Sequence, residues 1–222
     1  MAQRLKFRKS STLLPRTLSA LVLIPFCLYV IYVGPPYVLI LGGVTAIGLF
    51  IEWMRLLVKC TLPPFSKGIY ALVGTLYLSV TVVWFLHTMA LLEGWRLIFW
   101  LLFWVWSTDI AAFAGGRLFK GPKLARSISP NKTWSGFIAG MTVGVAVGYE
   151  TSFWVFPGVF SFWGIVLLVL IAQLGDLIES QAKRWSHVKD SSTLIPGHGG
   201  LLDRLDSLLA VSFALALWEV MW

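Results

Sequence analysis

The chain has 222 residues, of which 58% are hydrophobic and 15% aromatic, whereas only 13% are charged. This charged share is about half of that in soluble domains, and a chain of this length cannot enclose so many apolar side chains in one core. The composition therefore excludes a water-soluble globule and predicts an all-α, polytopic transmembrane helical bundle. The net charge of +8 then reports on topology and anionic lipid, and no nucleic-acid partner is expected.

Seven apolar stretches are long enough to cross about 30 Å of hydrocarbon as helices. They cover residues 17–33, 35–54, 69–87, 97–115, 133–149, 159–178 and 205–222. The first stretch follows a basic segment, as the apolar part of a signal peptide does. However, the turn Gly34-Pro35-Pro36 leads straight into the second stretch, so we expect an uncleaved span.

The basic residues divide unevenly between the loops. Seventeen of the eighteen Lys and Arg residues lie in the segments 1–16, 55–68, 116–132 and 179–204, and Arg96 lies in a loop on the other side. The positive-inside rule therefore predicts a cytosolic N-terminus and an external C-terminus. We expect one integral membrane domain over residues 1–222, with N-terminal spans in 1–100 and the spans and cytosolic loops of the site in 101–222.

A stripe of glycines marks the fifth apolar stretch. Gly136, Gly140, Gly144 and Gly148 are four residues apart and so share one helix face. Such a face lets another helix approach closely. It predicts tight packing inside the bundle, with a dimer seam as the alternative.

Two ionisable residues stand out within the predicted spans, where a charge is costly enough to suggest a function. Asp109 lies about two turns before the cytosolic end of the fourth span, and Asp176 lies at the cytosolic end of the sixth. The alternative is a structural ion pair with a Lys or Arg of a neighbouring helix.

The 31 residues from Asp176 to Asp206 contain five carboxylates, four Lys or Arg residues and two His residues. If the sixth helix continues beyond the membrane surface, Asp176, Ser180 and Lys183 share one of its faces. Asp203 and Asp206 similarly share a face at the start of the seventh helix. The glycines between Pro196 and Gly200 allow the backbone to approach a ligand closely and to direct N–H groups at phosphate oxygens.

This combination is what a magnesium-assisted nucleotide site requires. Magnesium takes one or two carboxylates together with water and phosphate oxygens, while Lys and Arg neutralise the remaining phosphate charge. The sequence has no cluster of Cys and His residues, which argues against zinc or copper. The alternative is a solvated loop whose acids only balance its basic residues.

A second basic loop precedes the fifth span on the same predicted side. Its residues Ser129, Asn131, Lys132 and Thr133 predict a helix start with Thr133 or Asn131 as the cap. A helix N-terminus beside a lysine binds anions. The alternative is a cap combined with a topology signal.

The segment Ser180 to Asp206, S-Q-A-K-R-W-S-H-V-K-D-S-S-T-L-I-P-G-H-G-G-L-L-D-R-L-D, resembles the signature of phosphatidate cytidylyltransferases, also called CDP-diacylglycerol synthases. All fixed positions of that pattern are met at their spacing over 27 residues. The segment Ser129 to Trp134, S-P-N-K-T-W, is similar to a second marker of the family, and Asp109 matches an Asp in the preceding span.

The resemblance implies transfer of CMP from CTP to phosphatidate, which gives CDP-diacylglycerol and pyrophosphate in phospholipid biosynthesis. It implies a homodimeric enzyme of a bacterial-type inner membrane with a cytosol-facing site, bound Mg²⁺ and an optional K⁺. The catalytic residues are expected to be Asp176, Lys183, Arg184, Asp190, Asp203 and Arg204. The metal ligands are expected to be Asp176 and Asp203, with Asp190 and Asp206 in addition. The substrate-binding residues are expected to be Asp109, Ser129, Lys132, Thr133, Ser180, Lys189, His198, Gly199 and Gly200.

Two other functions fit parts of the pattern. A CTP-dependent cytidylyltransferase or kinase for another membrane lipid would use the same polar residues. An ion-coupled transporter would use Asp109 and Asp176 to bind its ion. The absence of an inverted repeat and the gathering of acids near a phosphate-binding loop argue against the transporter.

Overall fold

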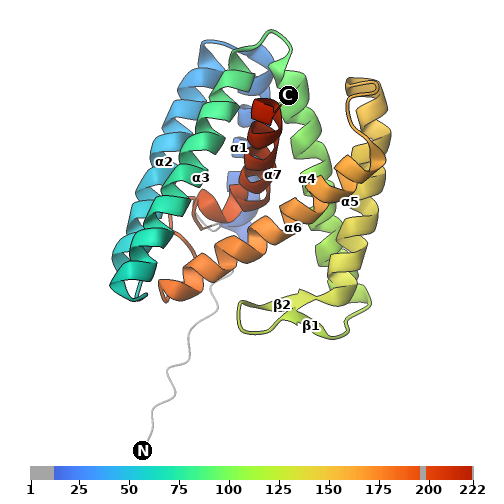
Figure 1. Cartoon of the computed structure of the whole chain (residues 1–222). Helices are drawn as coiled ribbons and strands as arrows, with labels where there is room; N and C mark the ends of the chain where they lie inside the picture. The colour runs from blue at the N-terminus through green and yellow to red at the C-terminus, as the bar shows by residue number, and fades with distance from the viewer. Residues whose placement is uncertain (1–12, 196–198, 222) are drawn as a thin grey trace, which may run out of the picture.

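The computed structural model describes residues 13–195 and 199–221, which form seven helices and one β-hairpin (Figure 1). The elements in chain order are α1 (Leu13–Val33), α2 (Tyr37–Lys59), α3 (Pro64–Ala90), α4 (Gly94–Leu118), β1 (Lys123–Ala125), β2 (Ser129–Thr133), α5 (Trp134–Val155), α6 (Phe162–Trp185) and α7 (Leu202–Met221).

Each predicted apolar stretch corresponds to one helix, and most helices extend beyond the stretch at one or both ends. Helices α2, α3, α4 and α6 are long and apolar enough to cross a membrane. These helices confirm an all-α membrane protein, whereas the total of seven spans stays a prediction. Helix α6 continues through Trp185, as the shared face of Asp176, Ser180 and Lys183 requires.

The connections predicted to be cytosolic gather at one end of the bundle. In Figure 1 the α2–α3 connection, the hairpin and the end of α6 lie at the lower end, and the C-terminus lies at the upper end. Two hydrogen bonds join these segments. The Thr61 N–H donates to the Trp185 carbonyl at 3.1 Å, and Arg184 Nε donates to the Ile128 carbonyl at 2.9 Å.

The segment predicted to start the fifth helix has a different structure. Ser129–Thr133 is strand β2, which pairs with β1 in antiparallel register, with Lys123 opposite Thr133. Helix α5 begins directly after it, and the Thr133 hydroxyl accepts a hydrogen bond from the Gly136 N–H at 3.2 Å. Thr133 is therefore the cap as predicted, while Asn131 lies in the strand. Residues 129–133 form a strand and not the first turn of a helix, because their backbone groups pair with those of β1.

The glycine stripe of α5 packs against the chain's own helices. All four glycines are buried. A Cβ atom at Gly144 would collide with the Thr108 hydroxyl of α4 and approach Val169 of α6, and one at Gly136 would meet the Ala112 carbonyl of α4. The stripe thus lets α5 approach α4, which confirms packing inside the bundle.

This packing predicts opposite effects for two glycine substitutions. Gly144→Ala should lower the free energy of unfolding by about 1–3 kcal/mol, because the added methyl group overpacks the contact with α4. Gly43→Ala in α2 is the matched control, since its added Cβ would meet open space outside its own helix backbone and alanine favours the helix by up to about 1 kcal/mol. Thermal unfolding in detergent measures both, and an equal loss in the two variants would contradict this packing.

Candidate active site

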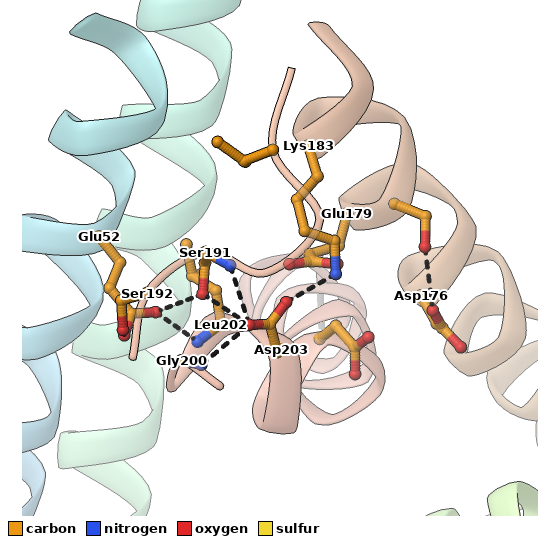
Figure 2. A network of polar contacts seen from close by, with 12 residues as sticks. Glu52, Asp176, Glu179, Lys183, Ser191, Ser192, Gly200, Leu202 and Asp203 are labelled. Carbon is orange, nitrogen blue, oxygen red and sulfur yellow. Dashed lines mark hydrogen bonds and ion pairs between the residues drawn. The ribbon is translucent and has the colours of Figure 1, made fainter. Parts of the chain in front are cut away.

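A buried lysine joins α6 to α7. Lys183 Nζ lies 2.5 Å from Glu179 Oε2, one turn earlier in α6, and donates to Asp203 Oδ1 at 2.6 Å (Figure 2). The side chains of these three residues are at most 11% exposed. Because an unpaired buried charge is costly, this pairing fixes the start of α7 relative to the end of α6.

The second oxygen of Asp203 binds the signature loop, the segment 189–201 that precedes α7. Oδ2 accepts hydrogen bonds from the N–H groups of Ser191 and Gly200, both at 2.9 Å, and from the Ser191 hydroxyl at 3.0 Å. Burial alone would raise the pKa of the Asp203 carboxyl. The hydrogen bonds from Lys183 and from the two N–H groups outweigh it and hold the pKa below its ordinary value, so Asp203 is ionised.

A second buried carboxylate holds the same loop from the opposite side. Glu52 of α2 is 1% exposed and accepts four hydrogen bonds. Oε2 accepts from the Ser191 hydroxyl at 2.8 Å and the Leu202 N–H at 2.9 Å. Oε1 accepts from the Ser192 hydroxyl at 2.5 Å and the Leu201 N–H at 2.9 Å. Helix α2 is thereby connected to both ends of the loop (Figure 2).

The described glycines of the signature serve this close packing. Gly199 has φ +91° and pairs with Ile195 through two backbone hydrogen bonds of 2.9 and 3.2 Å within the loop. A Cβ atom at Gly200 would lie within 2.7 Å of both Glu52 carboxylate oxygens. Gly200 is therefore required for the approach of Glu52. His198, a predicted substrate-binding residue, lies outside the described residues.

Asp176 has a different lysine partner. Lys132 Nζ of β2 lies 2.6 Å from Asp176 Oδ2, and the Ser180 hydroxyl makes a longer contact of 3.4 Å with Oδ1. Asp109 of α4 interacts electrostatically with both Asp176 and Lys132. The pair Lys132–Asp176 joins the hairpin to α6 at the first residue of the acidic segment Asp176–Asp206. Figure 2 places Asp176 apart from the bonds around Asp203, so the two aspartates predicted to share a metal each face their own lysine.

The remaining predicted residues surround these two pairs. Arg184 also donates to the Val188 carbonyl at 3.3 Å, so its guanidinium connects the hairpin to the loop after α6. Asp206 Oδ1 accepts from the Ser207 N–H at 2.8 Å and interacts electrostatically with Asp176 and Glu179.

Three predicted residues lie at the edge of the site. The side chains of Lys189 and Asp190 are exposed on the signature loop. Ser129 pairs with Ala125 at the end of the hairpin.

The donor chemistry of the site fits an oxygen-liganded cation. Asp109, Asp176, Glu179 and Asp206 lie close enough to interact electrostatically, while Asp176 pairs with Lys132 and Glu179 pairs with Lys183. Within residues 13–195 and 199–221, no three His, Cys, Asp or Glu side chains converge on one point. Magnesium does not need such a cluster, because it takes one or two carboxylates together with water and substrate phosphate.

An apolar cavity of about 540 Å³ lies beside the polar network. Side chains of α1, α2, α3, α4 and α7 line it, together with Ile195 and Leu201 of the signature loop. Arg204 is the one charged residue among its described lining residues. The cavity therefore meets the polar site at the first turn of α7, and its volume lies in the range of ligand pockets.

The sequence model described as "Cytidylyltransferase family" matches residues 57–221. The chain belongs to the cytidylyltransferase family. A phosphatidate cytidylyltransferase of Brucella suis biovar 1 (strain 1330) is 50% identical over 119 residues, which are 51% of this chain and 43% of that protein. The chain thus spans less than half the length of that relative. A phosphatidate cytidylyltransferase of Rickettsia bellii (strain RML369-C) is 35% identical over 215 residues, with 92% of this chain and 89% of that protein covered.

Membership of the cytidylyltransferase family confirms the resemblance drawn from the signature. The structure adds two residues of the polar network that lie outside the signature. The matched region begins at residue 57, after Glu52. Glu52 and Glu179 belong to the polar network, but neither was predicted from the sequence as a site residue. A signal for Glu52 was present, because it is an acid inside an apolar helix, as Asp109 is.

Lys183→Met should destabilise the protein by about 3–5 kcal/mol, because it leaves Glu179 and Asp203 buried without their cation. Without the lysine the two carboxylates repel each other when both are ionised, and protonation of either relieves this repulsion. The loss should therefore be largest at neutral pH and shrink as the pH falls. Lys189→Met, on the exposed part of the loop, should leave stability unchanged. Unfolding in detergent at pH 5 and pH 8 measures this, and a pH-independent loss would contradict the role of the ion pairs.

Proposed function

We propose that this protein transfers CMP from CTP to phosphatidate and releases pyrophosphate. The observation that carries the proposal is the meeting of the signature residues with an apolar cavity at the first turn of α7, in a member of the cytidylyltransferase family. A water-soluble nucleotide and a lipid phosphate need such a junction. The named relatives are phosphatidate cytidylyltransferases, which supports the same substrates here.

The reaction needs no nucleophile from the protein. A phosphate monoester has a second pKa of about 6 and is largely ionised at neutral pH. One of its oxygens forms a bond to the α-phosphorus of CTP, and the bond from that phosphorus to the bridging oxygen of the β-phosphate breaks. Catalysis then rests on positioning and on neutralising phosphate charge. Lys183, Arg184, Lys189 and Arg204 are the residues proposed for that neutralisation.

Asp176 and Asp203 are the proposed magnesium ligands, with Asp190 and Asp206 in addition and K⁺ as an optional second ion. When bound, the magnesium ion would stabilise negative charge on the phosphates. The surplus of carboxylates around Lys132 and Lys183 supports this assignment. Binding at Asp203 Oδ1 requires Lys183 to shift away from that oxygen, since the two atoms are 2.6 Å apart.

The apolar cavity is the proposed site of the acyl chains of phosphatidate. Its lining places Arg204 at the boundary with the polar network, where a lipid phosphate would lie. Burying an acyl chain contributes about 0.8 kcal/mol for each methylene group. A cavity of about 540 Å³ therefore favours long-chain substrates over short-chain ones.

We also propose seven spans, a cytosolic N-terminus and a site that faces the cytosol of a bacterial-type inner membrane. Two observations support this orientation: the division of Lys and Arg residues, and the gathering of the basic connections at one end of the bundle. The homodimer stays a prediction from the family resemblance.

The purified protein should convert labelled CTP and phosphatidate into pyrophosphate and lipid-linked CMP. Asp176→Asn should reduce this transfer by on the order of a hundred- to a thousandfold, since it removes one charge from the proposed phosphate and metal site. Glu150→Gln, which removes an exposed acid of α5, is the matched control and should retain activity.

The products separate the alternatives. Release of CDP with phosphorylated lipid would identify a kinase, and transfer to another lipid but not to phosphatidate would identify a different cytidylyltransferase. Full activity of Asp176→Asn, or of the wild type in EDTA, would exclude the proposed metal site. Asp203→Asn is less informative, because it also disturbs the contact of Asp203 with Lys183 and its three contacts with the loop.

Thr45→Phe should raise KM for dioleoyl phosphatidate and leave KM for CTP unchanged, because Thr45 lines the cavity and a phenyl ring fills part of it. Val44→Phe is the matched control, since the neighbouring Val44 is 64% exposed on the outside of α2. Kinetics with dihexanoyl phosphatidate should show a smaller effect of Thr45→Phe. Equal effects of the two variants would exclude the cavity as the acyl-chain site.

A further inference from the structure

We infer that Glu52 is a positioning residue for the reaction: it holds the signature loop in its active arrangement from a helix outside the signature. This inference rests on the proposed function for its kinetic consequences. It rests on the contacts of Glu52 alone for its structural part. Glu52 lies about 130 residues before the signature in the chain, and outside the region that matches the family model.

The contacts of Glu52 are distributed over both ends of the loop. Ser191 and Ser192 lie at its beginning, and Leu201 and Leu202 lie at its end, where α7 starts. A single carboxylate therefore closes the loop across its base. The backbone pairing of Ile195 with Gly199 lies inside this closure.

The position of Asp203 depends on the same closure. Ser191 contacts both carboxylates through one hydroxyl, at 2.8 Å from Glu52 Oε2 and 3.0 Å from Asp203 Oδ2. The N–H group of Gly200 donates to Asp203, and that of Leu202 donates to Glu52. If Glu52 released the loop, Asp203 would lose the fixed orientation of three of its hydrogen-bond donors.

The chemistry of the four donors makes a charged acceptor necessary. Each Glu52 oxygen accepts one hydroxyl and one backbone N–H. A hydroxyl group can rotate and accept a hydrogen bond instead, whereas a backbone N–H can only donate. A glutamine in this position would therefore direct its NH₂ group at the N–H of either Leu201 or Leu202 and leave that buried donor unsatisfied.

The variant Glu52→Gln should lower kcat for CMP transfer by on the order of a hundredfold, the effect of a small displacement of catalytic groups, while KM for CTP changes little. Hydrogen exchange of the folded protein in detergent should become faster at residues 199–202 and stay unchanged in α3, α4 and α5. Glu219→Gln is the matched control. Its carboxylate accepts from Trp84 Nε1 at 2.7 Å at the other end of α7, and a glutamine oxygen can accept the same bond.

A second variant separates the loop contact from general stability. Ser192→Ala removes one of the four donors and should have a smaller effect than Glu52→Gln. The double variant should be no worse than Glu52→Gln alone, because residues that act as a unit are not additive.

Unchanged kcat in Glu52→Gln would overturn the inference, as would faster exchange in all helices, which would indicate a purely structural role. Loss of kcat without faster exchange at residues 199–202 would also overturn it. If the wild type transfers no CMP, the proposed function fails, and the exchange measurement still decides whether Glu52 holds the loop.

Discussion

The contact between Lys183 and Asp203 determines how the polar part of this protein is arranged. A lysine that is 9% exposed among apolar helices needs compensating charge, and it finds Glu179 on its own helix and Asp203 on the next. Asp203 then uses its second oxygen to hold Ser191 and Gly200. The position of the signature loop therefore follows from the need to pair one buried cation.

The helices could be predicted from the sequence because a span must satisfy its backbone hydrogen bonds internally, so an apolar stretch of sufficient length becomes a helix. Their ends were less predictable. Helix α6 continues to Trp185 through polar residues, since contacts with the hairpin and with α7 stabilise its last turns. Strand β1 has three residues, which is too short for an alternating pattern, and the five residues of β2, Ser-Pro-Asn-Lys-Thr, do not alternate between apolar and polar.

The residue types of the site could be predicted, whereas their pairing could not. The carboxylates and lysines of the signature are visible in the sequence, but an ion pair depends on which helices face each other. Asp176 pairs with Lys132 of the hairpin although Lys183 shares its helix face, because Lys183 is held between Glu179 and Asp203. Glu52 carries the same signal as Asp109, an acid in an apolar helix, and only the packing of α2 against the loop reveals its role.

The first turn of α7 explains why an acid and a base must be neighbours in the signature. Successive residues of a helix point about 100° apart, so two adjacent side chains reach different surroundings. Asp203 accepts hydrogen bonds from N–H groups of the loop, such as that of Gly200, and Arg204 lines the apolar cavity. Under the proposed function, one helix turn then serves both substrates: Asp203 belongs to the side of the nucleotide and Arg204 to the side of the lipid. Because Glu52 accepts a hydrogen bond from Leu202 directly before them, the orientation of this turn, and with it the alignment of the two substrates, depends on a residue of α2.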